Sequence, residues 1–114
     1  MNPDNFPPVH DDGELERLIG SETALAVWFS GPDCRVCQDL RPKVAALLER
    51  RFPRIRRVGV DCAARPETAA QHQVFTIPVL LVFLDHRETL RLVRSFSPGQ
   101  IEQGLERPYR LLFD

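Results

Sequence analysis

The sequence predicts an α/β domain built on a central mixed sheet of four to five strands, with helices on both faces. Apolar runs of strand length alternate with segments whose apolar residues recur at helical spacing, the order expected for strand–helix–strand units with parallel strands. Two predicted strands near the C-terminus, 79–84 and 89–94, are close enough in sequence for an antiparallel hairpin. A chain of 114 residues suits one such domain, which we place over residues 1–114.

The amino-acid composition and net charge limit the classes of protein to which this chain can belong. Hydrophobic residues make up 43% of the chain and charged residues 27%, as in soluble globular proteins. A net charge of −1 argues against nucleic-acid and membrane partners, and no apolar run approaches the ~20 residues of a membrane span. The N-terminal residues lack the basic and apolar regions of a signal peptide, so we expect a cytoplasmic protein. In that compartment paired cysteines are more often catalytic or metal-binding than structural.

The N-terminal part predicts one helix and one strand. Residues 1–9 hold three prolines and are interpreted as an irregular lead-in. Asp11 or Asp12 is expected to cap a helix that ends at Gly20-Ser21. Its inward residues are Leu15, Leu18 and Ile19. The continuous apolar run 24–29 predicts a strand buried on both faces.

The middle of the chain predicts a long helix, a strand and a short helix. The helix covers 35–51, and Pro42 inside it is expected to kink it. Its apolar residues recur at helical spacing: Leu40, Val44, Leu47, Leu48 and Phe52. A strand at 55–61 and a short helix at 65–73, begun by Pro66, follow.

The C-terminal part predicts a hairpin and a last helix. The two strands named above are joined by Asp85–Glu88. Ser97 caps the helix, Pro98 starts it and Pro108 ends it. The remaining residues, 108–114, form an apolar tail that we expect to pack back on the domain, with a dimer or partner contact as the alternative.

Cys34 and Cys37 lie between the buried strand and the long helix. If Cys34 stands at the helix N-terminus, the unpaired backbone N–H groups and the helix dipole favour its thiolate, the nucleophile in disulfide exchange. Arg35 adds a positive charge and Asp33 opposes it. We expect the helix and Arg35 to prevail, which puts the pKa of Cys34 below the free value of about 8.5. Cys37, one turn later, is then placed to attack a mixed disulfide.

Two cysteines three apart are also typical of zinc sites and structural thiols. A tetrahedral zinc site needs two further ligands, and the available donors form no second CxxC or HxxxH pair: Cys62, His72 and His86. We therefore expect no metal and no other cofactor, and keep a zinc-binding domain as an alternative. Cys62 follows the predicted strand 55–61 and is interpreted as a partly buried structural thiol, with a third redox group as the alternative.

A second motif supports the redox interpretation of Cys34 and Cys37. Thr76-Ile77-Pro78 precedes an apolar strand, where a proline at the first position is tolerated. A strand, a CxxC that opens a long helix, a proline within that helix and a later X-Pro before a strand together resemble the thioredoxin family. The matching residues are Cys34, Cys37, Pro42 and Ile77-Pro78, and the resemblance covers roughly residues 10–107.

The resemblance implies a thioredoxin fold whose usual first strand is weak or missing. It also implies a thiol–disulfide oxidoreductase in which Cys34 attacks protein disulfides and Cys37 resolves the mixed disulfide. Ile77 and Pro78, joined by a cis peptide bond, would align the substrate through backbone hydrogen bonds. The implied partners are protein disulfides and a thiol reductant or disulfide reductase, and we expect a monomer.

The chain departs from the family behind the cysteines. Trp28 stands where the family has a buried aspartate that passes protons to the second cysteine, and Arg57 stands where it has a lysine on the adjacent strand. We expect Trp28 to fill the space behind the active-site helix and Arg57 to lie against the indole ring. Cys37 would then lack an internal base. Its proton would leave through water or an exposed carboxylate such as Asp33, and resolution would be slow.

Three further departures lie around the motif. Asp33 replaces a tryptophan, Arg35-Val36 stands between the cysteines, and Arg94 or Ser95 occupies the place of a glycine before the last helix. Disulfide exchange needs only two thiols and a proline platform, so the chemistry survives these changes. A thioredoxin-like module that binds a protein partner without catalysis stays open as the second interpretation.

Overall fold

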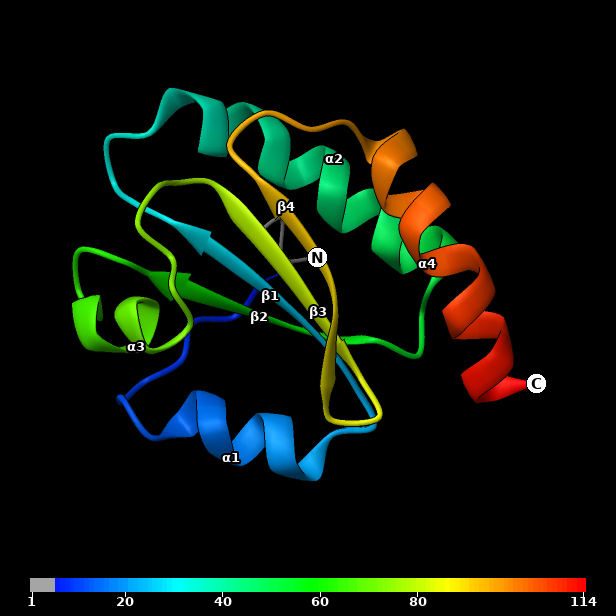
Figure 1. The fold of residues 1–114 in the computed structure, drawn as a ribbon. Coiled ribbons are helices and arrows are strands. Elements are labelled where there is room, and N and C mark those ends of the chain that lie inside the picture. The colour runs from blue at the N-terminus through cyan, green and yellow to red at the C-terminus, as the bar shows by residue number, and fades with distance from the viewer. Residues whose placement is uncertain (1–5) are drawn as a thin grey trace.

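The computed structural model describes residues 6–114 as one mixed sheet covered by helices on both faces (Figure 1). In chain order its elements are α1 (Glu14–Ser21), β1 (Ala24–Ser30), α2 (Arg35–Arg51), β2 (Arg56–Asp61), α3 (Pro66–Gln71), β3 (Val79–Leu84), β4 (Arg87–Val93) and α4 (Pro98–Phe113). The strand order is β2-β1-β3-β4, in which β1 and β2 are parallel and the other two pairs are antiparallel. Within the described residues no helix has the length and apolarity needed to cross a membrane.

Two cores lie on the two faces of the sheet, and the central strand β1 contributes to both. Successive side chains of a strand point to opposite faces. Ala26 and Trp28 therefore pack with α2 and α4, whereas Leu25, Val27 and Phe29 pack with α1 and α3. Because both faces of β1 are buried, its sequence is a continuous run of apolar residues.

The described part of the N-terminal lead-in runs along the outer edge of β2. Val9 N–H donates to Gly59 O at 3.0 Å, and Gly59 N–H donates to Pro7 O at 2.8 Å. A Cβ on Gly59 would lie 2.8 Å from Phe6 O, so only glycine allows this close approach. The lead-in is thus paired with the sheet through a single bridge at Pro8, which is consistent with a weak first strand. Residues 1–5 lie outside the described part.

The start of α1 differs from the prediction. Neither Asp11 nor Asp12 is the N-cap residue, which is Gly13. The Asp11 carboxylate instead accepts the Gly13 N–H at 2.8 Å, and Asp12 accepts the hydroxyl of buried Thr68 at 3.0 Å. The Asp12 carboxylate therefore ties the start of α1 to α3, a long-range contact that local capping preference does not reveal.

The hairpin between β3 and β4 is tighter than predicted. Only Asp85 and His86 form the turn, with φ of 53° and 68°, so β4 begins at Arg87 rather than at residue 89. Positive φ at both central positions matches the right-handed twist of the two strands. The glycine that usually signals such a turn is absent, which explains why the sequence predicted a connection of four residues, Asp85–Glu88, instead of two.

Pro108 does not end α4, so this prediction was wrong. The helix continues through Pro108 to Phe113. The Tyr109 ring packs edge-on against Phe52 with centroids 5.0 Å apart, and Phe113 lies 4.4 Å under the Arg54 guanidinium. The prediction that the segment 108–114 packs back on the domain is confirmed, but as helix, because aromatic packing outweighs the cost of a proline in its interior.

Candidate functional site

The two cysteines of the motif lie where β1 ends and α2 begins. They form a disulfide with Cα atoms 5.2 Å apart. Cys34 is partly exposed, and Cys37 is buried with 3% of its surface accessible. The thiol predicted to attack is therefore the accessible one.

The geometry of the α2 N-terminus favours a negative sulfur on Cys34. Cys34 is the N-cap residue, and its Sγ accepts the Cys37 backbone N–H at 3.1 Å. A sulfur in this place receives a donor that the helix otherwise leaves unpaired. Asp33 and Arg35 flank it in sequence and are both exposed. Solvent screens their charges, so the helix terminus is the larger influence on the thiolate.

Ile77 and Pro78 reach the same end of the sheet from β3. The peptide bond between them is cis. A Cβ on Gly31 would lie 2.9 Å from the Ile77 Cδ1 atom, so the Ile77 side chain covers the loop that leads to Cys34. Both Cys34 and Ile77 pack against the core between the sheet and α2. The structure thus brings the dithiol and the Ile77-Pro78 segment together.

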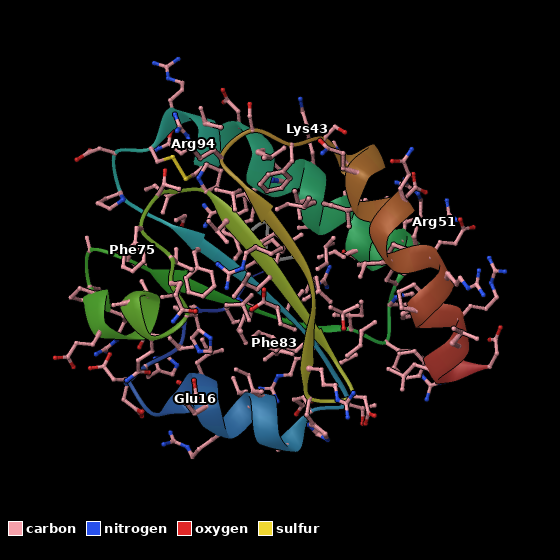
Figure 2. The ribbon with its side chains drawn as sticks, in the orientation of Figure 1. Glu16, Lys43, Arg51, Phe75, Phe83 and Arg94 are labelled. Carbon is pink, nitrogen blue, oxygen red and sulfur yellow. A yellow bond between two sulfur atoms is a disulfide. The ribbon has the colours of Figure 1, made fainter. Side chains whose placement is uncertain are left out.

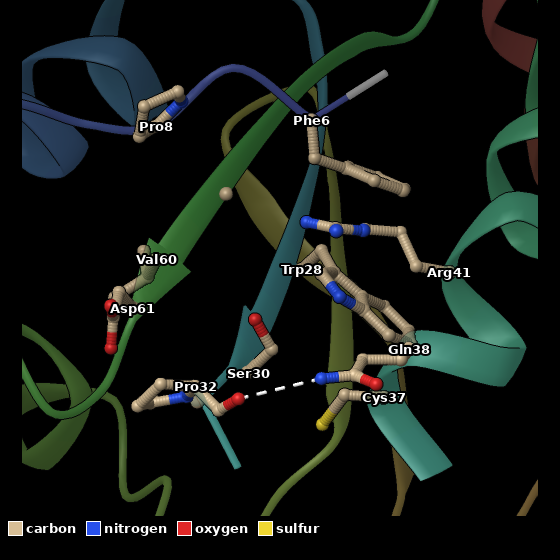
Figure 3. A pocket seen from close by; sticks show the side chains of 12 residues that line it. Phe6, Pro8, Trp28, Ser30, Pro32, Cys37, Gln38, Arg41, Val60 and Asp61 are labelled. Atoms are coloured by element: carbon tan, nitrogen blue, oxygen red, sulfur yellow. Dashed lines mark hydrogen bonds between the residues drawn. The ribbon is translucent and has the colours of Figure 1, made fainter. Parts of the chain in front are cut away.

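Trp28 fills the space behind the active-site helix. It is 1% exposed, stacks on Phe6 with ring centroids 5.7 Å apart, and meets Phe96 edge-on at 6.2 Å. Its Nε1 faces a pocket of about 240 Å³ that Cys37 and Arg41 also line (Figure 3). This nitrogen has no hydrogen-bond partner among residues 6–114.

The predicted contact between Arg57 and Trp28 is wrong. Arg57 donates to the backbone carbonyl of Ala45 in α2 at 3.0 Å, and its guanidinium lies 3.8 Å from Glu49. In the strand register Arg57 pairs with Ala26, whereas Trp28 pairs with Gly59. The long side chain of Arg57 therefore reaches across to α2 rather than along the strand to the indole, and it is 22% exposed there.

Arg41 and Phe6 line this pocket and were not among the site residues predicted from the sequence. The Arg41 guanidinium extends into the pocket near Phe6 and Trp28 (Figure 3). A signal was available, because Arg41 follows Cys37 by four positions in the predicted helix and so lies on the same face. Phe6 could not have been found this way, since only the fold brings the lead-in across β2.

Cys62 lies just after β2, and its thiol is not activated. Burial, with a smaller contribution from the neighbouring Asp61 carboxylate, raises the pKa of Cys62 to about 11. Its backbone N–H donates to Ser30 O at 2.8 Å, which fixes it against the end of β1. The interpretation as a structural thiol agrees with this environment.

The residue at the predicted glycine position is Arg94, not Ser95. Arg94 has φ of 68°, the left-handed conformation that favours glycine. Its N–H donates to Pro78 O at 2.7 Å, which ties the loop before α4 to the proline.

Comparison with known proteins decides the family. The thioredoxin family model matches residues 8–107. The chain belongs to the thioredoxin family. It is 35% identical to the thioredoxin-like protein YdfQ of Bacillus subtilis over 90% of this chain and 91% of that relative. It is 29% identical to a thioredoxin of Synechocystis sp. over 89% of this chain and 94% of that protein.

Solved structures agree on the fold. The oxidized mitochondrial thioredoxin 3 of Saccharomyces cerevisiae superposes with a TM-score of 0.81 at 20% identity, covering 92% of this chain and 97% of that one. The thioredoxin of Trypanosoma brucei brucei gives 0.83 at 14% identity, covering 96% of each chain. Family membership and a disulfide-forming Cys34–Cys37 pair make this chain a protein-disulfide oxidoreductase.

Proposed function

We propose that Cys34 is the attacking thiol and Cys37 the resolving thiol of this oxidoreductase. The observation that carries the assignment is the Cys37 N–H donated to Cys34 Sγ at the N-terminus of α2. The same donor would stabilise the thiolate of Cys34 once the disulfide is reduced, and partial exposure gives a substrate access to it.

The exchange proceeds in two displacements. The Cys34 thiolate attacks one sulfur of the substrate disulfide, forms a mixed disulfide and releases the other sulfur as a thiolate. Cys37 then loses its proton and attacks Cys34 Sγ, which releases the second substrate thiolate and forms the Cys34–Cys37 disulfide. Two electrons pass to the substrate, and the released thiolates take up protons.

The Ile77-Pro78 segment is proposed to align the substrate. It lies beside the Cys34 loop, and Ile77 is partly exposed there. The Ile77 backbone would hydrogen-bond an extended substrate segment so that its sulfur lies in line with Cys34. This role needs main-chain contacts only, so it fits substrates of varied sequence.

Resolution by Cys37 is proposed to be slow. Trp28 occupies the space behind Cys37, where it offers an N–H but no base. Burial disfavours the charged form of any thiol. The proton of Cys37 would leave through water or through an exposed carboxylate such as Asp33, so mixed disulfides at Cys34 should persist.

We also propose the physiological partners of this oxidoreductase. Protein disulfides are the substrates, and a thiol reductant or a disulfide reductase such as thioredoxin reductase would restore the dithiol. The cytoplasmic location and the monomeric state stay predictions.

Turbidimetric reduction of insulin in the presence of dithiothreitol tests the function. The protein should accelerate precipitation of the insulin B chain, and Cys34→Ser should remove the acceleration. An acceleration that survives Cys34→Ser, or none with the unmodified chain, contradicts the proposal and favours a binding module. The reduction potential of the Cys34–Cys37 pair, measured against glutathione, then decides whether the chain acts as a reductant or as an oxidant.

A further inference from the structure

Arg94 occupies a strained turn beside the active site. With φ of 68° at Arg94, the Ser95 N–H donates to Val93 O at 2.8 Å across it. A bond between residues two apart, about a central residue of positive φ, defines the rarer and strained form of the γ-turn. A side chain with a Cβ is disfavoured in this conformation, whereas glycine adopts it freely.

The fold does not need an arginine in this turn. The contribution of the position to the structure is a backbone one, the 2.7 Å bond from Arg94 N–H to Pro78 O, which any residue other than proline can make. The side chain is exposed and makes no hydrogen bond or ion pair with residues 6–114. When a residue is held in a strained conformation and its side chain does not stabilise the fold, the side chain is a candidate for a role in function.

The side chain of Arg94 lies near the N-terminal part of the active-site helix α2. Arg94 lines a hollow of about 200 Å³ together with Val36, Asp39 and Lys43 of α2. Val36 is two residues from Cys34 and is 52% exposed. The bond to Pro78 fixes the Arg94 backbone to the proposed substrate platform, and Figure 2 shows Arg94 at the end of the molecule that carries the disulfide.

The charges around Cys34 balance except for Arg94. The exposed Asp33 and Arg35 flank the cysteine with opposite signs, and Asp39 and Lys43 do the same in the hollow. Among the charged side chains that flank Cys34 or line this hollow, Arg94 is the one without a counterpart of opposite sign, so this part of the rim is positive. Replacing Arg94 by a neutral residue would leave this part of the rim without net charge.

We propose that Arg94 is a specificity-determining residue that selects protein segments with an aspartate or glutamate next to the reacting cysteine. The inference rests on the proposed function, because it concerns the substrate of the same dithiol. The guanidinium pairs with the substrate carboxylate while the segment lies along Ile77-Pro78. Bond making and breaking between sulfurs are unchanged.

Kinetics with matched peptide disulfides test this. The substrates are symmetric disulfides of one short peptide in which the residue directly before or directly after the cysteine is Glu, Gln or Lys. Each is mixed with the reduced protein at low salt. Samples quenched with acid at successive times give the second-order rate constant of reduction. At one of these two positions the peptide with Glu should react about fivefold faster than the peptide with Lys. This ratio is expected because the Glu peptide gains one exposed ion pair with Arg94 and avoids the charge repulsion that the Lys peptide meets. Salt at 0.5 M should reduce the ratio.

Three variants identify the residue responsible. Arg94→Gly keeps the turn and should reduce the Glu/Lys ratio to less than about twofold, and Arg94→Glu should reverse it. Lys43→Gln, the matched control in the same hollow, should keep most of the preference. The rate with neutral hydroxyethyl disulfide is measured for all four proteins, and each peptide rate constant is divided by it, so that a change in the reactivity of the Cys34 thiolate itself does not count as a change of preference.

The outcomes separate the two proposals. A Glu/Lys ratio near one in the unmodified protein, or a preference that survives Arg94→Gly or disappears with Lys43→Gln, overturns the role of Arg94 and leaves the oxidoreductase intact. Failure to reduce both the peptides and hydroxyethyl disulfide overturns the proposed function itself. Thermal unfolding of Arg94→Gly, expected at or above the midpoint of the unmodified protein, shows that any loss of preference is not a loss of fold.

Discussion

Cys34 and Cys62 occupy related places in the molecule with opposite chemical consequences. Each follows a strand of the parallel pair β1–β2 at the same end of the sheet, and the Cys62 N–H bonds to Ser30 O at the end of β1. Cys34 caps a helix of 17 residues, and its sulfur receives a backbone N–H. Cys62 is half-buried beside the Asp61 carboxylate, and its pKa is raised to about 11.

The difference teaches that the end of a parallel strand does not by itself activate a thiol. What activates it is the immediate start of a helix, which directs unpaired N–H groups at the sulfur. After Cys62 the chain first makes a turn capped by Asp61, and α3 starts only at Pro66. The neighbouring group at Cys62 is therefore an anion rather than a row of donors, and burial acts in the same direction.

The largest expected effect separates the two thiols by function. Cys34→Ser should lower insulin reduction at least about 10³-fold, to the background of dithiothreitol, because the nucleophile is lost. Cys62→Ser should leave the rate within about twofold. Cys37→Ser should accumulate mixed disulfides at Cys34, which mass spectrometry of the unreduced protein detects. A comparable loss in Cys62→Ser would contradict the comparison.

Alkylation measures the same difference on the reduced protein. With a pKa of about 11, only about one Cys62 thiol in 10⁴ is ionised at pH 7, so iodoacetamide should modify Cys34 at least about 100-fold faster. The Cys62 rate should rise about tenfold per pH unit up to pH 10, since the thiolate is the reacting form. Mass spectrometry of each cysteine peptide gives the rates. Equal modification at pH 7 would refute the assignment.

Trp28→Asp tests whether a base is what the buried cysteine lacks. A carboxylate behind Cys37 should speed the resolving step about tenfold, at a cost of roughly 3–5 kcal/mol in unfolding free energy from the lost packing. The second release of thionitrobenzoate after mixing with Ellman's reagent reports that step. Trp28→Asn, of the same size but without a charge, is the control. If the aspartate variant is no faster than the asparagine variant, the missing-base idea fails.

The smallest effect concerns the cause of the raised pKa at Cys62. Asp61→Asn removes the negative charge but keeps an oxygen that can accept the Ala63 N–H, now bonded at 2.9 Å. Burial is the larger cause, so the pKa should fall only part of the way. The alkylation rate of Cys62 at pH 9 should therefore rise by about threefold or less. A rate equal to that of an unfolded cysteine would show that charge, not burial, dominates.

The sequence by itself determined the features that depend on neighbours along the chain. The 17-residue helix from Arg35 follows from apolar residues at helical spacing, and β1 follows from an uninterrupted apolar run. The place of Cys34 at the helix start was predictable for the same reason, and so was the cap at Ser97. Such features depend on contacts between residues at most four apart, which the sequence states directly.

Only the tertiary structure decided the partners of long side chains. Arg57 reaches Ala45 rather than Trp28, and Trp28 packs on Phe6, which lies 22 positions earlier in the chain. Pro108 stays inside α4 because the helix beyond it packs its aromatic residues on Phe52 and Arg54. A propensity or a pairing of charges gives a preference of about 1–3 kcal/mol, and the packing of distant aromatic groups is large enough to override it.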